Sequence, residues 1–568
     1  MSLVSLYDAA SLWMTPSGAE DGKLFSQLPT DGSGDFTFSR GSNLAATRVG
    51  PTGLIEKGRE NLLTQSNNFS ATPWASSGTT ETSGQSGYDG SSDAWLLSAA
   101  NAGDFIYRND ITSFSGLTTI SVYAKKGTAD GIRLRFNQTT DVNLYINLAA
   151  GAIIGAFAPG IAYAIEDALN GWYRIQMSFI ASGTQDFRIY PTNATGTSIA
   201  GTIYIQDAQA EIGLAATDYI ESGATTGKAG LLENEPRLDY SGGATCPSLL
   251  LEPSRTNLVG YSEYFEGTGW TLGTGVLTSN TNETTSPEGL YNAAKLVDTN
   301  NATQLYYRGM SVTASTQYTF SFYAKGNIST PTLAVYDESN AAFIAVDVAY
   351  SISTDSWTRI TQTITTPVGC TSLRVYPIRG TGSGTIYIWG AQVEQGSYPT
   401  SYIPTYGTSQ TRSIDLTTAD TSSFYTDSSK GTLFTELSFP LAADGNYNGW
   451  FFWNGSGYHR IVLQRRGDTG RGQIEVRINN TTQASVISSS AITLEDNHKM
   501  LVRWDGNVFT LFIDGVNIGN DTSTDVYSGT DLNELSSRPT YNAANIKQAV
   551  LFPTALNDSE CIALTKLD

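Results

Sequence analysis

Aromatic and polar residues that could bind a sugar gather in one short stretch of the C-terminal half. Trp450 and Trp453 lie in a run of four aromatic residues, and a glycine-rich turn leads from there to Tyr458 and His459. Aromatic rings can stack on the C–H face of a pyranose while neighbouring polar groups hydrogen-bond its hydroxyls. The same run also fits a buried strand followed by a glycine turn, and both interpretations stay open.

The chain also repeats itself. Four pairs of motifs recur in the same order: NLL at 61 and NLV at 257, SVYAK at 121 and SFYAK at 321, WYRI at 172 and WTRI at 357, and IYI at 203 and 386. Solenoid repeats have periods of about 20–50 residues, so a spacing this long indicates a duplicated folded domain. Two copies of one surface favour multivalent binding over catalysis.

Comparison of the two copies sorts the aromatic candidates. Rings that both copies share are expected in the core, because a fold keeps the residues that fill it; they are Trp74, Trp270, Tyr123 and Tyr323. Trp389 differs, since the first copy has Gln206 at this place. Trp389 is therefore either a sugar-binding ring on an exposed sheet face or a core residue that only the second copy needs.

Two carboxylates recur after the closing strand of each copy. Glu211 and Glu394 could contribute oxygen ligands to a structural calcium ion. The alternative is a hydrogen bond or an ion pair, with Arg174 or Arg359 as the partner. We expect no other cofactor, because the sequence has no EF-hand loop and no histidine spacing typical of a metal site.

Motifs that would indicate an enzyme are missing from the sequence. It has no Gly-x-Ser-x-Gly, His-Glu-x-x-His or phosphate-loop pattern, and its two histidines, His459 and His498, lie in no catalytic motif. A glycosidase needs only two carboxylates, and 53 acidic residues leave that possibility open. We expect no catalytic residues and no enzyme activity.

Composition excludes several partners. The formal net charge is −20 and only 15% of residues are charged, so a phosphate backbone would be repelled. No apolar stretch is long enough for a membrane-spanning helix. The cysteines Cys246, Cys370 and Cys561 are odd in number and far apart, which predicts buried free thiols. With no basic, apolar leader at Met1, we expect synthesis in a host cytoplasm without a signal peptide.

Short alternating strands between glycine and asparagine turns predict an all-β protein. We divide it into an irregular N-terminal anchor (1–60), a first jelly-roll sandwich (61–222), a connector (223–256), a second jelly-roll sandwich (257–405) and a third sandwich (406–568) that ends in a short capped helix. GLIE at 53 and GLLE at 230 echo each other, which suggests that the first repeat was inserted beside an older element.

Several stretches resemble known families. KGTLFTELSF, HKMLVRWDGNVFTLFIDGVNIG and ALNDSECIAL resemble concanavalin-like, laminin-G-type domains. The openings NLLTQSNNFSATPW and NLVGYSEYFEGTGW, with the closing stretches IYIQDAQAEIG and IYIWGAQVEQG, resemble carbohydrate-binding-module jelly rolls of tailed-phage virion proteins. The resemblance implies a surface protein of the virion, such as a head or tail fibre or a capsid decoration.

This resemblance implies adhesion to glycans on a host surface. It also implies contacts with other virion proteins through the N-terminal segment, and a homo-oligomer for which we expect a trimer. A purely structural spacer that binds only virion proteins is the alternative. A depolymerase tailspike fits less well, because the sequence shows no long parallel β-helix repeat.

Overall fold

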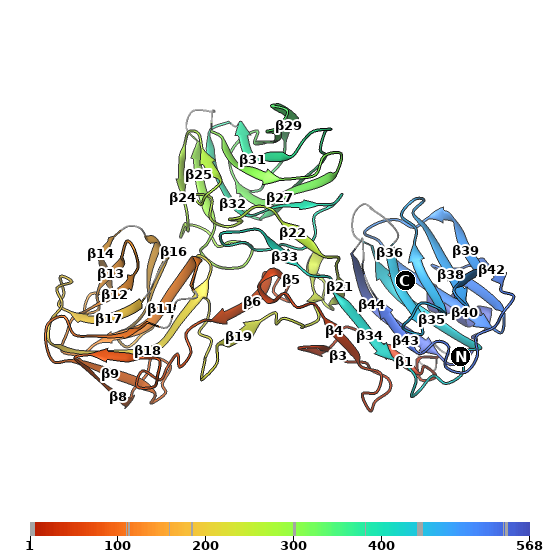
Figure 1. Ribbon diagram of the computed structural model, residues 1–568, viewed down its shortest axis with the longest axis horizontal. Helices are drawn as coiled ribbons and strands as arrows, with labels where there is room; N and C mark the ends of the chain where they lie inside the picture. The colour runs from red at the N-terminus through yellow and green to blue at the C-terminus, as the bar shows by residue number, and fades with distance from the viewer. Residues whose placement is uncertain are drawn as a thin grey trace.

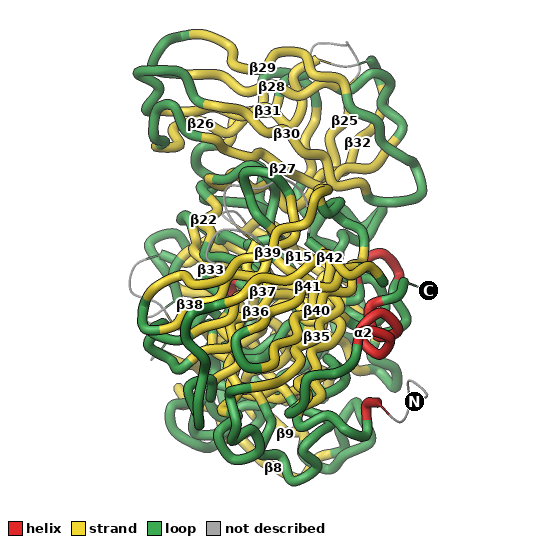
Figure 2. Tube along the Cα trace, turned by 90° about the vertical axis from the view of Figure 1, so that its right-hand side faces the viewer, coloured by secondary structure: helices red, strands yellow, loops and turns green. Residues whose placement is uncertain are grey.

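The computed structural model describes residues 6–109, 111, 114–157, 160–182, 186–298, 303–380, 382–439, 447–537, 539 and 543–567. Residues 1–5 of the expected N-terminal segment lie outside this set. Three β-sandwiches surround a central group of short strands (Figure 1), and strands dominate the chain (Figure 2). The predicted all-β class is confirmed.

The first sandwich, module 1, consists of two six-stranded antiparallel sheets. One holds, in spatial order, β14 (Ala152–Phe157), β13 (Val142–Asn147), β12 (Gly131–Asn137), β17 (Asp186–Thr192), β10 (Phe105–Arg108) and β7 (Ala75–Ser77). The other holds β15 (Gly160–Asp167), β16 (Trp172–Ala181), β11 (Gly116–Lys126), β18 (Gly201–Ile212), β9 (Ala94–Ala99) and β8 (Thr79–Gln85). Because side chains alternate along a strand, apolar residues of both sheets meet in one core.

The second sandwich, module 2, repeats this strand order with five strands in each sheet. One sheet runs β23 (Trp270–Leu272), β26 (Leu305–Ser311), β31 (Ser372–Gly380), β28 (Thr332–Asp337) and β29 (Ala342–Ala349). The other runs β24 (Val276–Thr278), β25 (Ala294–Asp298), β32 (Gly384–Gln395), β27 (Gln317–Gly326) and β30 (Thr358–Thr365). The β11–β18 pair shifts register between Ser121 and Tyr123, and the β27–β32 pair does so between Ser321 and Tyr323. This shared irregularity agrees with a duplicated domain.

The third sandwich has one eight-stranded and one nine-stranded sheet. The first contains β20 (Leu238–Asp239), β21 (Ser248–Leu251), β44 (Ala544–Phe552), β35 (Lys430–Ser438), β40 (Asn497–Asp505), β41 (Val508–Ile513) and β42 (Val516–Thr522), with β1 (Leu12–Met14) also paired to β44. The second contains β2 (Ala19–Glu20), β3 (Lys23–Leu24), β4 (Phe36–Ser39), β34 (Leu416–Asp420), β43 (Glu534–Ser537), β36 (Tyr447–Trp453), β37 (Arg460–Arg465), β38 (Arg471–Ile478) and β39 (Thr481–Ala491).

The N-terminal residues do not form the separate anchor that we expected. β1 pairs with β44 and β4 pairs with β34, and Leu12, Phe36 and Phe38 lie in the core of the third sandwich. So short a segment cannot bury a core of its own, and its strands therefore complete the sheets of a larger domain.

Both modules are insertions in this third sandwich. The chain enters module 1 through β6 (Ile55–Asn61) and leaves through β19 (Gly227–Gly230), and these two strands pair with each other. It enters module 2 through β22 (Arg255–Asn257) and leaves through β33 (Gln410–Arg412), which also pair. The strands of residues 238–251, within the expected connector, return to the third sandwich between the two insertions.

These entry and exit strands, with β5 (Thr47–Val49), η1 (Asn43–Ala45) and η2 (Ser241–Gly243), form the hub at the centre of Figure 1. A buried ion cluster holds the hub together. Arg237 Nη1 and Arg412 Nη1 lie 2.6 and 2.9 Å from Glu252 Oε2, and Arg237 also pairs with Asp415. Burial alone would raise the pKa of Glu252, but Arg412 and Arg237 outweigh it and hold this pKa well below its usual range.

Smaller sequence predictions can also be compared with the structure. The terminal helix is present as α2 (Asp558–Thr565), with Asn557 and Glu560 forming a capping box. Cys370 and Cys561 are buried, whereas Cys246 is exposed, because it lies in the turn before β21. Across the described ranges, no helix has the length and apolar character needed to cross a membrane.

Candidate functional site

The outward face of one sheet in module 1 carries aromatic and arginine side chains. Along β12 the buried Ile132, Leu134 and Phe136 alternate with Arg133 and Arg135, which point away from the core. Neighbouring strands add rings and a further arginine to the same face, which we call face 1; its members are Phe105, Tyr107, Arg133, Arg135, Asn143, Tyr145, Arg188 and Tyr190. Figure 1 shows β12, β13 and β17 on the side of module 1 away from the hub.

Contacts within face 1 hold these groups in place. The guanidinium carbon of Arg188 lies 4.7 Å from the ring centroid of Phe105, and that centroid lies 4.8 Å from that of Tyr190. Arg188 Nη1 donates to the Tyr190 hydroxyl at 3.4 Å, and Arg188 Nε lies 2.6 Å from Asp186 Oδ1. The hydrogen bond to Asp186 raises the pKa of Arg188, so the guanidinium stays charged.

Module 2 presents the same arrangement on the equivalent sheet. Face 2 consists of Tyr306, Tyr336, Phe343, Arg374, Tyr376 and Arg379. The guanidinium carbon of Arg374 lies 4.9 Å from the Tyr306 centroid, its Nη1 donates to the Tyr376 hydroxyl at 3.1 Å, and its Nη2 lies 2.9 Å from Glu338. Phe343 is 39% exposed, which is enough for a sugar ring to reach it.

Sequence reasoning missed both faces, although a signal was present. Arg188-Ile189-Tyr190-Pro191 recurs as Arg374-Val375-Tyr376-Pro377, between the repeated tryptophan motifs at 172 and 357 and the IYI motifs at 203 and 386. A core needs the buried Ile189 and Val375, but it does not need an arginine on the outward side of the same strand. Repetition of the outward residues therefore indicates a shared surface role.

Two predicted glycan-binding rings cannot reach a sugar. Trp389 and Trp450 are both 0% exposed. Trp389 packs against Tyr402 at 4.4 Å between ring centroids and contacts Ile55 of the hub, so it is the core residue that only the second copy needs. Trp450 lies in the core of the third sandwich, where its Nε1 donates to Thr435 Oγ1 at 3.0 Å.

The other three predicted rings lie on the hairpin between β36 and β37. Tyr458 is 48% exposed, and its ring centroid is 5.0 Å from that of His459. Trp453 is half-buried, and its Nε1 donates to Glu534 Oε1 at 2.7 Å. This arrangement leaves Tyr458 as the main exposed ring of the hairpin, without the paired arginines of faces 1 and 2.

Glu211 and Glu394 act as hydrogen-bond acceptors in the structure. Glu394 Oε1 accepts from Gln392 Nε2 at 2.6 Å and from Thr400 N at 2.8 Å, and Glu211 Oε2 repeats this with Gln209 Nε2 at 2.6 Å and Thr217 N at 2.9 Å. These contacts fix the chain as it leaves each module. Among the described residues, no group of three or more His, Cys, Asp or Glu side chains is placed to hold a metal ion, and calcium binding stays an untested hypothesis.

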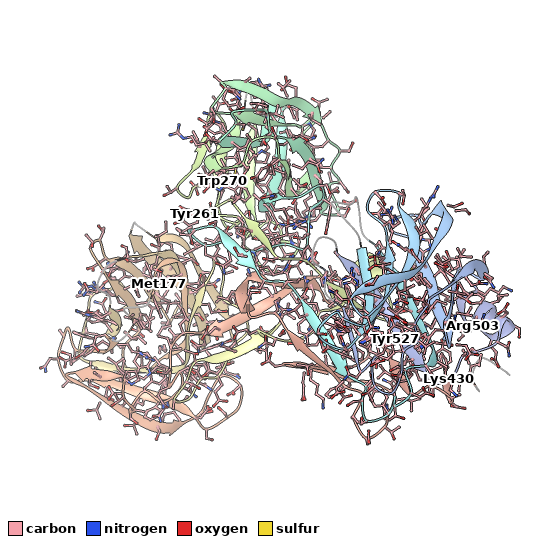
Figure 3. All side chains as sticks on the ribbon, turned by 45° about the vertical axis from the view of Figure 1, so that its right-hand side comes forward. Met177, Tyr261, Trp270, Lys430, Arg503 and Tyr527 are labelled. Atoms are coloured by element: carbon pink, nitrogen blue, oxygen red, sulfur yellow. The ribbon has the colours of Figure 1, made fainter. Side chains whose placement is uncertain are left out.

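The shared aromatic residues divide between core and surface. Trp74 and Trp270 are buried as predicted, and Trp270 Nε1 donates to the Tyr261 carbonyl at 2.7 Å at the base of module 2 (Figure 3). Tyr123 and Tyr323 are only half-buried and lie on the outer side of their sheets. There Arg174 lies over Tyr123 at 5.4 Å and Arg359 over Tyr323 at 5.5 Å.

Module 2 also contains a cavity outside face 2. Its volume is about 600 Å³, and Arg255, Gln317, Tyr318 and Gln395 are among the residues that line it. The guanidinium carbon of Arg255 lies 5.8 Å from the Tyr398 ring centroid beside it. We treat the two faces as the candidate site, because their arginine–tyrosine hydrogen bond recurs in both modules.

Residues 258–380 match the sequence model of the family described as a carbohydrate binding domain. This match covers most of module 2 and supports a carbohydrate-binding β-sandwich there. No curated protein matches the chain.

Solved structures similar to parts of the chain include the CBM40 of Ruminococcus gnavus IT-sialidase bound to α2,3-sialyllactose, at 15% identity, covering 24% of this chain and 83% of that one with a TM-score of 0.21. Domain 4 of the arabinanase AbnA from Geobacillus stearothermophilus, in complex with arabinotriose, is similar at 12% identity over 27% and 73% of the chains, with a TM-score of 0.22. The enzymatically active domain of tailspike protein 4 of bacteriophage CBA120 is similar at 18% identity over 24% and 21%, with a TM-score of 0.21.

Proposed function

We propose that this chain is a phage virion surface protein, a fibre or a capsid decoration, that adheres to glycans through faces 1 and 2. The observation that carries the proposal is the repeated arginine–tyrosine pair, Arg188 with Tyr190 and Arg374 with Tyr376, on outward sheet faces. Exposed rings such as Phe343 would stack on sugar C–H groups, and the fixed guanidinium would donate to sugar hydroxyls. The carbohydrate-binding family match within module 2 supports this role.

Two faces on one chain would raise weak affinities by avidity. A second binding event becomes intramolecular once the first face is bound, which can strengthen overall binding about 10²-fold or more. A trimer, which we also propose, would multiply the effect. The proposal assigns no catalytic step to the protein, and it places the protein at the virion surface.

A rigid spacer that binds only virion proteins is the second candidate. The hub favours it, because Arg237, Arg412 and Asp415 are fully buried, and Arg237 joins Asp415 beside the third sandwich to Ser401 of module 2. Separating the partners of such a cluster would leave buried charges uncompensated, which favours one fixed arrangement of the parts that it joins. Rigidity is also compatible with adhesion, since it would hold both faces at a fixed separation.

Glycan-array binding of the full-length chain tests the proposal. We expect Tyr145→Ala in face 1 and Phe343→Ala in face 2 each to weaken binding about tenfold, and the double variant to abolish it. Tyr458→Ala, which removes an exposed ring outside both faces, is the matched control and should bind as the unaltered chain does. No glycan binding by the unaltered chain would favour the spacer, and failure of antibodies against the chain to decorate purified particles would overturn the virion assignment.

A further inference from the structure

Faces 1 and 2 share one arginine but differ at the neighbouring strand. Arg133 on β12 pairs in register with Tyr190, whereas Ala334 on β28 pairs with Tyr376. Tyr190 and Tyr376 are equivalent residues, so Arg133 is an arginine that face 1 has and face 2 lacks. Module 1 therefore has a cationic side chain at a position where module 2 has the methyl group of Ala334.

Arg133 also differs from the other arginines of the faces in its charge balance. Arg135, Arg188 and Arg374 lie 2.6, 2.6 and 2.9 Å from the carboxylates of Asp141, Asp186 and Glu338, and Arg379 pairs with Asp347. Arg133 instead donates from Nε and Nη2 to the amide oxygen of Asn143, at 3.0 and 2.7 Å. Within the described part of the chain, Arg133 has no carboxylate partner.

Two tyrosine rings hold this cation in position. The guanidinium carbon of Arg133 lies 4.9 Å from the Tyr190 centroid and 5.3 Å from the Tyr145 centroid. A neutral amide on one side and aromatic faces beside it fix the orientation of the group without neutralising it. Its Nη1 makes no hydrogen bond to any described residue, and the side chain is half-buried at the surface.

We infer that face 1 binds an acidic glycan, with the carboxylate of a uronic or sialic acid on Arg133. A carboxylate matches the planar donors of a guanidinium and would form a charge-assisted hydrogen bond. Tyr145, the half-buried ring beside Arg133, would contact the sugar that carries the carboxylate, whereas the buried Tyr190 supports the guanidinium from below. This inference rests on the proposed function, because it names the sugar class for one of the two faces.

The test measures binding of the full chain to oligogalacturonate, a hyaluronan oligosaccharide and 3′-sialyllactose, each beside its carboxyl-reduced counterpart. We expect at least one acid to bind more tightly than its reduced form. Arg133→Ala, which copies Ala334 of module 2, should weaken binding of that acid about tenfold and largely remove the difference in affinity between the acid and its reduced form. Arg133→Lys keeps the charge without the planar donors. Its affinity for the acid should lie between those of the unaltered chain and the Arg133→Ala variant.

Arg466→Ala is the control, because it removes an equal charge from an exposed site in the third sandwich. Equal binding of each acid and its reduced form would overturn the inference while leaving glycan adhesion intact. Equal loss in the Arg133→Ala and Arg466→Ala variants, or equal binding of dextran sulfate and the acids, would also overturn it, since either result indicates general attraction between charges. Thermal unfolding of each variant separates loss of binding from loss of fold.

Discussion

Trp389 stands in module 2 at the place that Gln206 occupies in module 1, and both side chains are fully buried. Gln206 pairs in register with Tyr123, and Trp389 pairs with Tyr323. The surroundings explain the difference. Gln206 Nε2 donates to Asp93 Oδ1 at 2.8 Å within module 1, whereas Trp389 belongs to a buried cluster with Tyr402 and the hub residue Ile55.

We therefore predict that Trp389→Gln loosens the junction between module 2 and the hub. Loss of a buried tryptophan costs about 3–5 kcal/mol, and the amide would be left without the partners that Gln206 has. Limited proteolysis of the full chain should then cut near residue 405 faster than in the unaltered protein. Trp389→Phe keeps most of the apolar contact and should remain resistant; equal resistance of the Trp389→Gln variant would contradict this account of Trp389.

The buried ion cluster of the hub predicts a large loss of thermal stability when a single one of its charges is removed. Arg237→Met leaves Glu252 and Asp415 with one cation fewer in a buried site, which costs about 3–5 kcal/mol. The midpoint of thermal unfolding should fall by several degrees. Arg466→Met, at the exposed pair with Asp468, should leave it nearly unchanged. Similar midpoints for the two variants would show that the hub cluster does not hold the sandwiches together.

Asn61 and Asn257 provide a duplicated test of the module fold. In module 2, Asn257 Nδ2 donates to the carbonyls of Ala391 and Ile403 at 3.1 and 2.9 Å, and its Oδ1 accepts from Val259 and Val393 at 3.1 Å. Asn61 repeats all four bonds in module 1.

Replacing either asparagine by alanine leaves buried backbone N–H and C=O groups without a hydrogen-bond partner. Each unsatisfied group lowers the free energy of unfolding by about 1–3 kcal/mol. Calorimetry should show that Asn61→Ala and Asn257→Ala lower the stability of their modules to thermal unfolding by similar amounts. A small loss in one variant and a large loss in the other would mean that the two modules do not share this support.

Stability of module 1 should depend on pH through Asp207. Burial, with smaller contributions from Asp93 and Asp89, raises the pKa of Asp207 from 3.8 to about 7, against a hydrogen bond from Tyr88 that lowers it. Between pH 4 and 7 the folded state then holds a proton that the unfolded chain has released. Asp207 therefore contributes to the free energy of unfolding at low pH, and this contribution is lost as the pH rises toward 7. The loss amounts to about 1.4 kcal/mol for each unit of difference between the folded and unfolded pKa values.

Asp207→Asn removes that charge and keeps a residue that tolerates the positive φ of 53° found there. Thermal unfolding should show that the stability of the variant relative to the unaltered chain increases from pH 5 to pH 8, because the unaltered chain loses the contribution of Asp207 across this range. Asp468→Asn is the control, because the hydrogen bond from Arg466 lowers the pKa of Asp468 to about 2. A stability gap for Asp207→Asn that is the same at both pH values would contradict the assignment.

Sequence reasoning succeeded where a local pattern decides the structure. Alternation along β12 and the cap of the terminal helix at Asn557 both act within a few residues. The insertion of the first repeat was also visible in the GLIE and GLLE echo. Pairing of β1 with β44 joins residues more than 500 positions apart, and no local pattern encodes it.

The candidate site shows the same difference between what a local sequence pattern determines and what depends on distant strands. Trp389 and Trp450 were chosen for their residue type, but burial depends on which distant strand covers them. Arg188 and Arg374 were overlooked because arginine on a strand is usually only a solvated side chain. Their significance depends on the repeated Tyr190 and Tyr376 two positions on, which becomes clear once the outward face of the sheet is known.

The central claim, that two outward sheet faces bind sugar, is tested most directly by a crystal structure of the chain with the oligosaccharide that binds tightest on the array. The account predicts sugar density over the rings of face 1 or face 2, in contact with Arg188 or Arg374. Density only at Tyr458 or in the cavity beside Arg255, with both faces empty, would contradict it.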